Sequence, residues 1–321
     1  MTVNDRENVS GTTVTEFVLL GFSNHQEMEV PLFVLFLTMY VLTILGNALV
    51  ILLIHLDARL HTPMYYFLSN LSWLEIIITT TVTPKMLSLL ISKTKTISYL
   101  GCVVQTMSYF LAGATEVLLL GAMSVDRYLA ICNPLRYTAI MSNQVCMLMM
   151  LSCWMGSIAS VMVTFIFKSG LPFCGPNVID HFFCDANPLT QLLCADTTMV
   201  QAVELISSCF TLLTSVFVTS VSYFCIIVTV MRMPSVDGRK KAFSTCSSHI
   251  TVASLYYGSS IFIYVRPAGS TSMDFNKVAT VFNTVVTPLL NPIIYNFRNK
   301  VVKDVMRDKV KHISGRLEKT V

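Results

Sequence analysis

Two glutamates lie within long apolar stretches of the sequence, where an ionised side chain is costly. Glu75 falls near the middle of residues 63–90, and Glu116 near the middle of residues 102–129. Ionisable groups in such positions are candidates for a functional site. Two carboxylates at similar depth can share a proton, hold a cation such as sodium, act as a general acid/base pair, or hydrogen-bond as two protonated acids. No nucleophile, metal-ligand triad or phosphate-binding loop accompanies them in the sequence, so we expect neither an enzyme nor a cofactor.

A charged triplet, Asp126-Arg127-Tyr128, stands at the end of residues 102–129. An acid beside an arginine at a helix end can form an ion pair that opens when another partner offers a better ligand. An arginine at the end of an apolar segment is also a common topology anchor. The triplet alone therefore leaves a switch and an anchor open.

The last apolar stretch, residues 278–295, contains Asn291 followed by Pro292. Proline removes one backbone hydrogen bond from a helix and lets the helix kink. The asparagine side chain can bond the freed backbone. We therefore expect a kinked helix at this position.

The elements that hold these residues are seven apolar stretches. The 321 residues are 54% hydrophobic and only 12% charged, and the mean hydropathy is +0.65. Because a soluble domain is about one quarter charged, this composition disfavours a soluble protein. Each stretch is long enough to cross a hydrocarbon core of about 30 Å as a helix. We therefore expect an all-α membrane protein, a seven-transmembrane helix bundle. The predicted spans are residues 30–54, 63–90, 102–129, 144–167, 199–230, 243–265 and 278–295.

The positions of the basic residues predict the orientation of the bundle. An odd number of spans puts the two chain ends on opposite sides, and cytoplasmic segments are enriched in lysine and arginine. Of the 22 lysines and arginines, 15 lie on the side of the C-terminal tail. We therefore expect a cytoplasmic C-terminus and an extracellular N-terminus, where Asn8 in an Asn-Val-Ser sequon is a predicted glycosylation site. The net charge of +4 is too small to indicate nucleic-acid binding.

The spans divide the chain into three parts: an extracellular N-terminal tail at residues 1–29, a transmembrane domain at 30–295 and a cytoplasmic segment at 296–321. In the last part, valines recur at helical spacing among lysines and arginines from residue 297 to 311. This pattern predicts a short cytoplasmic amphipathic helix that lies on the membrane surface, with membrane lipid as its partner.

Four of the ten cysteines lie on the predicted extracellular side, where disulfides persist. Cys102 begins the third span, and Cys174, Cys184 and Cys194 lie in the long loop between the fourth and fifth spans. Four thiols allow three sets of pairings, and the sequence alone does not choose among them. A zinc site that includes His181 is an alternative that the oxidising side and the irregular spacing disfavour.

Ordered motifs cover nearly the whole chain, from Gly46-Asn47 in the first span to Phe297-Arg298-Asn299 after the last. The further motifs are Leu60-His61-Thr62-Pro63-Met64-Tyr65, residues 123–132 followed by Pro134-Leu135-Arg136-Tyr137, Ser222-Tyr223, residues 241–249 and residues 288–292. In these motifs the sequence resembles a rhodopsin-like (class A) G-protein-coupled receptor, and specifically an odorant (olfactory) receptor. It departs from the family pattern at Glu75, where aspartate is usual, and at Ser124-Val125, where Ala-Tyr usually precedes the triplet.

The resemblance implies a switch at the cytoplasmic side. Arg127 would engage the G protein when the sixth span swings outward, and Asp126 would restrain it at rest. The other implied switch positions are Tyr128, Tyr223, His249, Asn291, Pro292 and Tyr295.

The resemblance also implies two disulfides, Cys102–Cys184 and Cys174–Cys194. Glu75 and Glu116 match the paired acidic positions of the family, which implies a sodium site there. The extra methylene of the first glutamate weakens that implication.

By the same resemblance, a ligand pocket lies among the outer halves of the third, fifth, sixth and seventh spans, with Tyr257 at its floor. Its positions are apolar and aromatic with scattered hydroxyls, and no acid lies on the third-span wall, where an amine would need one. We therefore expect a small, neutral, mostly apolar volatile, such as an aldehyde, alcohol or ester, with one hydroxyl contact. The other implied lining residues are Tyr109, Phe110, Gly113, Ala114, Ser207, Thr211, Ser260, Ile261, Tyr264 and Thr284.

The implied function is an odorant receptor of the plasma membrane that activates a stimulatory, olfactory-type heterotrimeric G protein and raises cAMP. A non-olfactory G-protein-coupled receptor for a small metabolite is the nearest alternative, since motifs do not reveal where a gene is expressed. A membrane transporter is a remote alternative, because it would predict inverted repeats and broken helices near the midplane.

Overall fold

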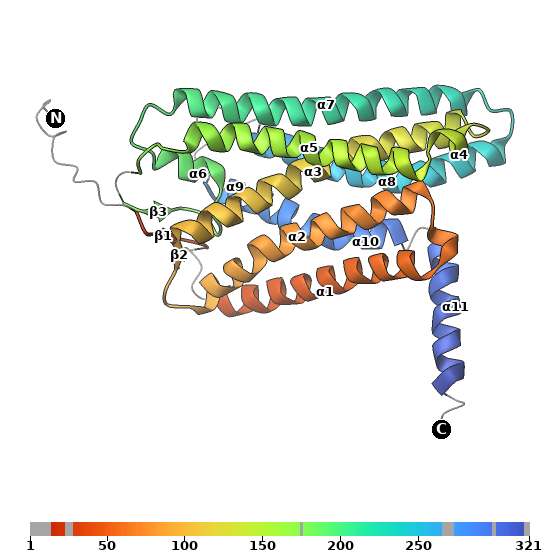
Figure 1. The fold of residues 1–321 in the computed structure, drawn as a ribbon. Coiled ribbons are helices and arrows are strands. Elements are labelled where there is room, and N and C mark those ends of the chain that lie inside the picture. Colours follow the sequence, from red (N-terminus) through yellow and green to blue (C-terminus); the bar gives the residue numbers. More distant parts are fainter. Residues whose placement is uncertain (1–13, 23–27, 174–175, 265–272, 297–299, 318–321) are drawn as a thin grey trace, which may run out of the picture.

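Long helices that lie side by side make up most of the molecule (Figure 1). The computed structural model describes residues 14–22, 28–173, 176–264, 273–296 and 300–317. Within these ranges, six helical segments are long and apolar enough to cross a membrane. They are α1 (Glu29–Leu56), α2 (Pro63–Ile91), α3 (Tyr99–Cys132), α5 (Asn143–Lys168), α7 (Thr198–Met231) and Asn276–Tyr295. The last segment comprises part of α9 (Met273–Val281), the π-helical turn η4 (Phe282–Val286) and most of α10 (Thr287–Asn296).

The seventh helix of the bundle is α8 (Val236–Tyr264), which is as long as its neighbours but more polar. It begins seven residues before the predicted start at 243, with Asp237 and Arg239 in its first turns. It contacts α3, α7 and α10 lengthwise. Because a helix rises 1.5 Å per residue, its 29 residues extend about 43 Å, so the polar turns can stand outside a hydrocarbon core of about 30 Å. The predicted seven-helix bundle is confirmed.

Local signals set the starts of three spanning helices. Pro63 occupies the first turn of α2, where its missing N–H is not needed. The Ser98 hydroxyl accepts a hydrogen bond from the Gly101 backbone (3.1 Å) at the start of α3, and the Ser142 hydroxyl accepts one from Val145 (3.4 Å) at the start of α5. These starts set the depth of the polar side chains that each helix carries.

The centre of the bundle is α3, which contacts α2, α5, α7 and α8. Two glycines permit close approach: a Cβ on Gly121 would lie 3.0 Å from Ser215 Oγ of α7, and a Cβ on Gly156 of α5 would lie 3.1 Å from Leu118. The outer faces of α1, α5 and α7 expose large apolar side chains, among them Phe224. Lipid is the solvent that suits such faces.

A three-stranded sheet covers one end of the bundle, which we call the capped end (Figure 1). The central strand β1 (Glu16–Leu19) pairs antiparallel with β2 (Thr96–Ser98) and parallel with β3 (Val178–Ile179). The short helix α6 (Ala186–Gln191) lies at the same end.

Residues 14–22 of the predicted N-terminal tail are part of the folded molecule, because β1 belongs to the sheet. Within that segment, Phe17 and Leu19 are completely buried against the bundle, in a cluster that includes Phe182 and Phe183. The segment has no apolar stretch of span length, so the sequence did not reveal that residues 14–22 pack as part of the fold.

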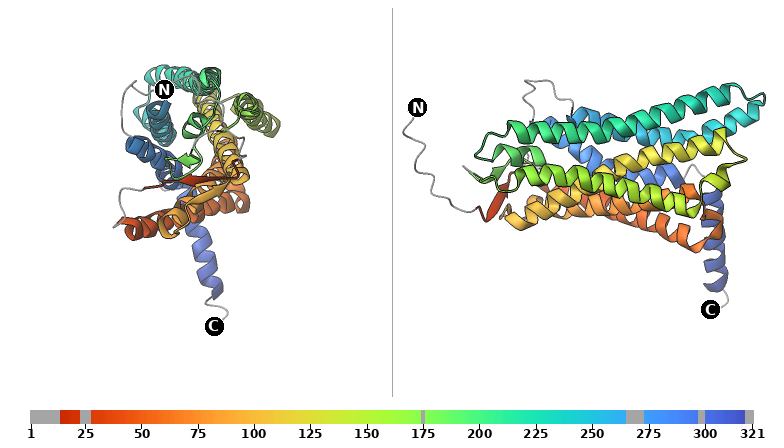
Figure 2. Two further views of the ribbon diagram at one scale, coloured as in Figure 1. Left: turned by 90° about the vertical axis from the view of Figure 1, so that its left-hand side faces the viewer. Right: turned by 45° about the horizontal axis from the view of Figure 1, so that its top comes forward.

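The opposite end, which we call the switch end, carries η3 (Ala58–Leu60), the short helix α4 (Tyr137–Ile140) and α11 (Lys300–Leu317). The predicted amphipathic helix at 297–311 is present as α11, which runs across the bundle axis (Figure 2). Val302 and Val305 of α11 are buried in the same core cluster as Leu60. The apolar stripe of this helix therefore docks on the bundle, and residues 297–299 lie outside the described ranges.

Candidate functional site

A buried ion pair occupies the last turns of α3 at the switch end. The Arg127 guanidinium donates to the Asp126 carboxylate from Nε (3.0 Å to Oδ2) and also from Nη2. Asp126 is 1% exposed and Arg127 is 7% exposed. Because a buried charge is costly without its partner, each residue holds the other in place.

A third side chain, Tyr137 of α4, completes this group. Its hydroxyl donates to Asp126 Oδ1 at 2.7 Å. Burial and this hydrogen bond raise the pKa of Tyr137, so the phenol remains a neutral donor at physiological pH. Sequence reasoning gave Tyr137 no role, because the fold of α4 back onto α3 cannot be read from its motif.

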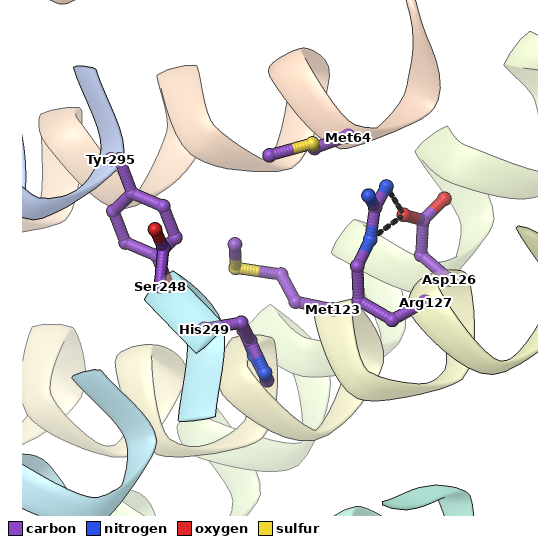
Figure 3. A pocket seen from close by; sticks show the side chains of 7 residues that line it. All are labelled: Met64, Met123, Asp126, Arg127, Ser248, His249 and Tyr295. Atoms are coloured by element: carbon purple, nitrogen blue, oxygen red, sulfur yellow. Dashed lines mark hydrogen bonds and ion pairs between the residues drawn. The ribbon is translucent and has the colours of Figure 1, made fainter. Parts of the chain in front are cut away.

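Beside the ion pair lies a small cavity that polar side chains and two methionines line (Figure 3). Its volume is about 10 Å³, near the lower limit for one water molecule. His249 of α8 and Tyr295 of α10 line it, and within the described residues neither His249 Nε2 nor the Tyr295 hydroxyl has a hydrogen-bond partner. These groups are alternative partners within the cavity that Arg127 also lines. The remaining lining residues are Met64, Met123, Asp126 and Ser248.

A hydrogen bond of 2.6 Å between the Tyr223 hydroxyl and His249 Nδ1 links α7 to α8. Tyr223 therefore belongs to the same polar group although it does not line the cavity. Tyr128 does not line the cavity either. Its half-buried side chain packs against the apolar cluster that contains Tyr223 and Ile226.

The Asn291-Pro292 pair joins α10 to α1 and α2. Asn291 Nδ2 donates to Glu75 Oε1. A Cβ on Gly46 of α1 would lie 3.4 Å from Pro292 Cβ, and Asn47 Nδ2 donates to the Pro288 carbonyl at 3.3 Å. The motif thus fixes α10, the part of the seventh span nearer the switch end, against the first and second spans.

Glu75 and Glu116 lie fully buried near one another in the middle of the bundle, close enough to interact electrostatically. Five buried side-chain oxygens in this region, from α1, α2, α3 and α10, have no hydrogen-bond partner among the described residues. They are Asn47 Oδ1, Glu75 Oε2, Thr79 Oγ1, Glu116 Oε1 and Asn291 Oδ1, and we call these five residues the midplane group. Buried polar atoms are normally paired, so this group has capacity for a proton or for a hard cation with oxygen ligands. It contains no more than two acidic side chains, and in the described part of the chain no three His, Cys, Asp or Glu residues form a metal cluster.

A chain of hydroxyls joins α5 to α7 in the region of the predicted ligand pocket. Ser160 Oγ and Ser207 Oγ lie 2.7 Å apart, and the Thr211 hydroxyl donates to Ser160 Oγ at 3.3 Å. Ser207 and Thr211 were predicted, whereas Ser160 was not, since a serine in an apolar span usually bonds its own backbone.

Tyr257, the predicted floor residue, forms a second hydroxyl group. Its hydroxyl lies 2.7 Å from Ser215 Oγ and 3.0 Å from Thr219 Oγ1, both on α7. Ser215 Oγ also donates to the Val117 carbonyl of α3 at 2.5 Å. Tyr257 therefore ties together the three helices that bound the predicted pocket from below.

The α3 wall is aromatic. The Tyr109 ring packs edge-on against Phe110 (5.2 Å between centroids) and against Phe183 of the long loop (4.9 Å). The Tyr256 hydroxyl donates to the Gly113 carbonyl at 3.2 Å and so crosses from α8 to α3. Neither Phe183 nor Tyr256 was predicted, because the folding of the loop and the rotation of α8 cannot be read from spacing.

The other predicted pocket residues are placed differently from one another. Ser260 and Thr284 are buried inside the bundle, and Ala114 is half-buried on α3. Ile261, next to Ser260 on α8, is 43% exposed. Tyr264 ends α8, but its side chain lies outside the described residues.

The long loop between α5 and α7 is fastened to α3 at the capped end. A disulfide joins Cys102 to Cys184, which is the pairing that the resemblance implies. The Cys184 backbone donates to Gln105 Oε1 (2.9 Å), and its carbonyl accepts from the Thr106 hydroxyl (2.7 Å). Gln105 Nε2 donates in turn to the Thr81 carbonyl of α2 (2.9 Å). These bonds hold Phe183 in place over Tyr109.

The remaining loop cysteine in the described residues, Cys194, is disulfide-bonded, while its implied partner Cys174 lies outside them. A zinc site at this loop is excluded, because Cys184 is already in a disulfide. Asn8, the predicted glycosylation site, also lies outside the described residues.

One lysine joins three separate segments at the capped end. Lys277 of α9 is 5% exposed, and its Nζ donates to Asp180 Oδ1 (2.7 Å) in the long loop and to the Gly21 carbonyl (2.9 Å) after β1. The ion pair locks the sheet and the loop to the seventh span. Sequence reasoning counted Lys277 only for topology.

Comparisons with known proteins agree with this arrangement. The family described as "Olfactory receptor" matches residues 36–313. Olfactory receptor 6E1 of Mus musculus is 51% identical over 94% of this chain and 96% of its own length, and olfactory receptor 6J1 of Homo sapiens is 48% identical over 95% and 88%. The crystal structure of squid rhodopsin has the same fold, with a TM-score of 0.69 and 14% identity over 90% of this chain and 87% of that one.

Proposed function

This chain belongs to the olfactory receptor family, and from that premise we propose that its ligand is a small, neutral, mostly apolar volatile such as an aldehyde, alcohol or ester. As an odorant receptor it is a multi-pass plasma-membrane protein and not an enzyme. Membership of the family does not specify the chemistry of the ligand or the residues that recognise it, and these are proposed below.

The observation that supports this ligand class is the composition of the predicted pocket. Aromatic rings of Tyr109 and Phe110 provide apolar walls, and the hydroxyls of Ser207 and Thr211, with Ser160, provide weak polar contacts. A pocket of this type holds a ligand mainly by apolar contact and orients it by one hydrogen bond. Glu204, one turn from Ser207 on α7, is ion-paired with Lys168, and Glu116 lies buried deeper in the midplane group, so an amine has no free counter-ion there.

A panel of volatiles tests the ligand class. Cells that express the receptor and an olfactory-type G protein are exposed to aldehydes, alcohols, esters, acids and amines, and cAMP is measured against concentration. We expect responses from neutral members of the panel only. Replacement of Ser207 or Thr211 by alanine should weaken the response to the best ligand, whereas Ile206→Ala, whose side chain is 68% exposed on the same helix, is the matched control. A response confined to amines would sink the proposal.

The switch residues support coupling to a stimulatory, olfactory-type heterotrimeric G protein. A ligand acts on the bundle only through a difference in affinity between two helix arrangements. The resting arrangement is represented by the Asp126–Arg127 pair, and Tyr223, His249 and Tyr295 are the groups that Arg127 would meet when α8 moves. The proposed roles of Tyr128, Asn291 and Pro292 in this switch rest on their positions in the family motifs.

We place the capped end outside the cell and the switch end in the cytoplasm. The excess of lysine and arginine on the side of the C-terminal tail supports this orientation. In that orientation residues 1–29 form the extracellular segment with a glycan on Asn8, residues 30–295 form the transmembrane domain, and residues 296–321 are cytoplasmic. The second disulfide would be Cys174–Cys194.

The midplane group would hold either a sodium ion or a shared proton between Glu75 and Glu116. Its unpaired oxygens support both, because each occupant neutralises one of two buried carboxylates. The basic face of α11 would contact lipid head groups, since its apolar stripe is docked and its other side carries Lys303, Arg307 and Lys311.

A further inference from the structure

A groove lies between α3 and α7 near the switch end, apart from the cavity of the ion pair. Its volume is about 300 Å³, which corresponds to roughly ten water-sized groups. Tyr128, Cys132 and Asn133 line it from α3, and Val228 and Thr229 line it from α7. None of the predicted odorant-pocket residues lines this groove, and of the switch positions only Tyr128 does.

The groove opens on the membrane face of the bundle. Phe224, at its edge, is 69% exposed and lies on the outer face of α7 with other exposed apolar side chains such as Ile227 and Met231. Of the side chains that line it, Cys132 and Thr229 already engage one another (3.2 Å between Sγ and Oγ1), while Phe224 and Val228 offer apolar surface. An occupant must therefore come from the lipid and fill the groove by apolar contact.

Two arginines stand one helical turn beyond the groove. The Arg232 backbone donates to Val228 and Thr229, and the Arg136 backbone donates to Asn133 at 3.1 Å. Both arginines are exposed, and within the described residues neither forms an ion pair, although Arg59, Arg127 and Arg307 do. Guanidinium groups near a membrane surface bind phosphate strongly and in a fixed geometry.

We propose that this groove binds one acyl chain of an anionic phospholipid, whose head-group phosphate lies against Arg136 and Arg232. Charge complementarity decides the occupant, since a zwitterionic lipid gains little from two unpaired arginines, whereas each basic residue attracts an anionic head group. The proposal depends on the chain lying in a membrane, which its family shows, and not on the identity of the odorant.

The occupant would contact the helices that carry the switch. Tyr128 follows Arg127 directly, and Phe224 follows Tyr223, which is bonded to His249. A lipid in the groove therefore lies beside α3 and α7 at the turns where both helices carry their switch residues.

Photolabelling of the reconstituted receptor tests the proposal. The full chain is placed in phosphatidylcholine nanodiscs with a small fraction of phosphatidylserine that bears a diazirine on one acyl chain. Both leaflets then contain the label, so the outcome does not depend on orientation. We expect labelled peptides from the α3 and α7 segments that line the groove. We also expect about fivefold less labelling for each of Arg136→Gln and Arg232→Gln, from the attraction of one arginine for an anionic lipid.

Val228→Trp, which fills the groove, should reduce labelling of these peptides to background. Val221→Trp, on the exposed face of α7 outside the groove, is its matched control and should label normally. The arginine variants change only exposed side chains, so they keep the test decisive if the tryptophan variant does not fold. Equal labelling of wild type and Val228→Trp, equal labelling by a phosphatidylcholine probe, or stronger labelling by a fatty-acid probe would each overturn the proposal.

Discussion

At the scale of single residues, the proposed resting state of the switch would depend on one phenol hydroxyl, that of Tyr137. Asp126 accepts from Arg127 on one carboxylate oxygen and from Tyr137 on the other. The buried acid thus has both oxygens satisfied only while α4 stays folded against α3. This couples the stability of the ion pair to the segment that follows α3.

Tyr137→Phe should raise signalling in the absence of odorant. Loss of a hydrogen bond to a buried charge costs about 1.5–3 kcal/mol, which would shift the equilibrium away from rest by roughly ten- to a hundredfold. Basal cAMP, normalised to surface receptor, measures the effect. Tyr66→Phe at the same end is the matched control, because the Tyr66 hydroxyl forms no hydrogen bond in the described part of the chain. Unchanged basal cAMP in Tyr137→Phe would show that the hydroxyl does not restrain the switch.

Arg127→Ala should abolish the cAMP response to any odorant while the receptor still reaches the cell surface. The guanidinium is the only cation that lines the cavity of Figure 3, so no neighbour in that lining can replace it. Surface labelling and cAMP are measured on the same cells, with Lys240→Ala of α8 as the control. A full response from a variant that lacks Arg127 contradicts the switch assignment.

At the scale of elements, α11 is held to the bundle by charge as well as by its valines. Arg59 of η3 donates to Asp57 Oδ1 from Nε (2.9 Å) and to Asp308 of α11 from Nη1 (2.9 Å). Lys309 Nζ donates to the Leu56 carbonyl at 3.3 Å. These bonds orient α11 across the end of α1, where its basic side chains can lie along a membrane surface.

The Asp57–Arg59 part of this clamp should resist acid. The hydrogen bonds that Arg59 donates lower the pKa of Asp57 to about 2. Because a depressed pKa contributes stability above the ordinary aspartate value of about 4 and loses it only as the pH falls through the folded value, the Asp57–Arg59 contact should stay intact from pH 8 to pH 4. Distances between spin labels on α1 and α11 measure docking over this range.

Arg59→Gln should broaden the same distance distribution at every pH. Arg307→Gln is its control, since Arg307 forms only a 4.0 Å pair with Asp304 of the same helix. Undocking of α11 between pH 8 and pH 4 in the unaltered receptor contradicts the assignment.

Sequence patterns located elements that depend on local composition. The predicted spans 30–54 and 199–230 begin and end within two residues of the limits of α1 and α7. In these two helices the helical segment and the apolar segment of the sequence coincide, so hydropathy located both ends. The polar first turns of α8 were missed, because hydropathy detects the part inside the lipid and not where a helix begins. The π-helical turn η4 carries no local signal that we recognised.

Sequence motifs named residues of the candidate site but not the side chains that hydrogen-bond to them. Motifs identified Asp126 and Tyr257, but the hydroxyls that bond them belong to Tyr137, Ser215 and Thr219. Such contacts depend on the rotation and depth of each helix, which one sequence without relatives does not determine.

At the scale of the whole molecule, Lys277 connects the segments that cover the capped end, which we call the cap: the sheet and the long loop between α5 and α7. Its ammonium group joins the seventh span, the long loop and the chain after β1. The cap is therefore a joint of three distant segments and not a loop laid over the bundle.

Lys277→Met should lower the melting temperature of the purified receptor. Hydrogen bonds to charged groups contribute about 1.5–3 kcal/mol each, and a chain of this size loses roughly 2 °C per kcal/mol, so loss of both bonds should lower the melting temperature by roughly 6–12 °C. Thermal unfolding in detergent measures the effect. Lys93→Met, an exposed lysine at the same end, is the matched control and should leave the melting temperature unchanged. Equal melting of both variants and the unaltered receptor would show that the Lys277 contacts do not stabilise the cap.

The sheet pairs strands that are far apart in the sequence, so it is completed late during synthesis of the chain. β1 leaves the ribosome first, yet Val18 pairs with Val178, a residue made about 160 positions later. At roughly 5–20 residues per second, the edge of β1 that pairs with β3 waits about 10–30 s unpaired while four spans enter the membrane. During that interval a chaperone or a neighbouring nascent chain can occupy the strand. Secretory quality control, more than the stability of the finished receptor, would then decide how many copies mature.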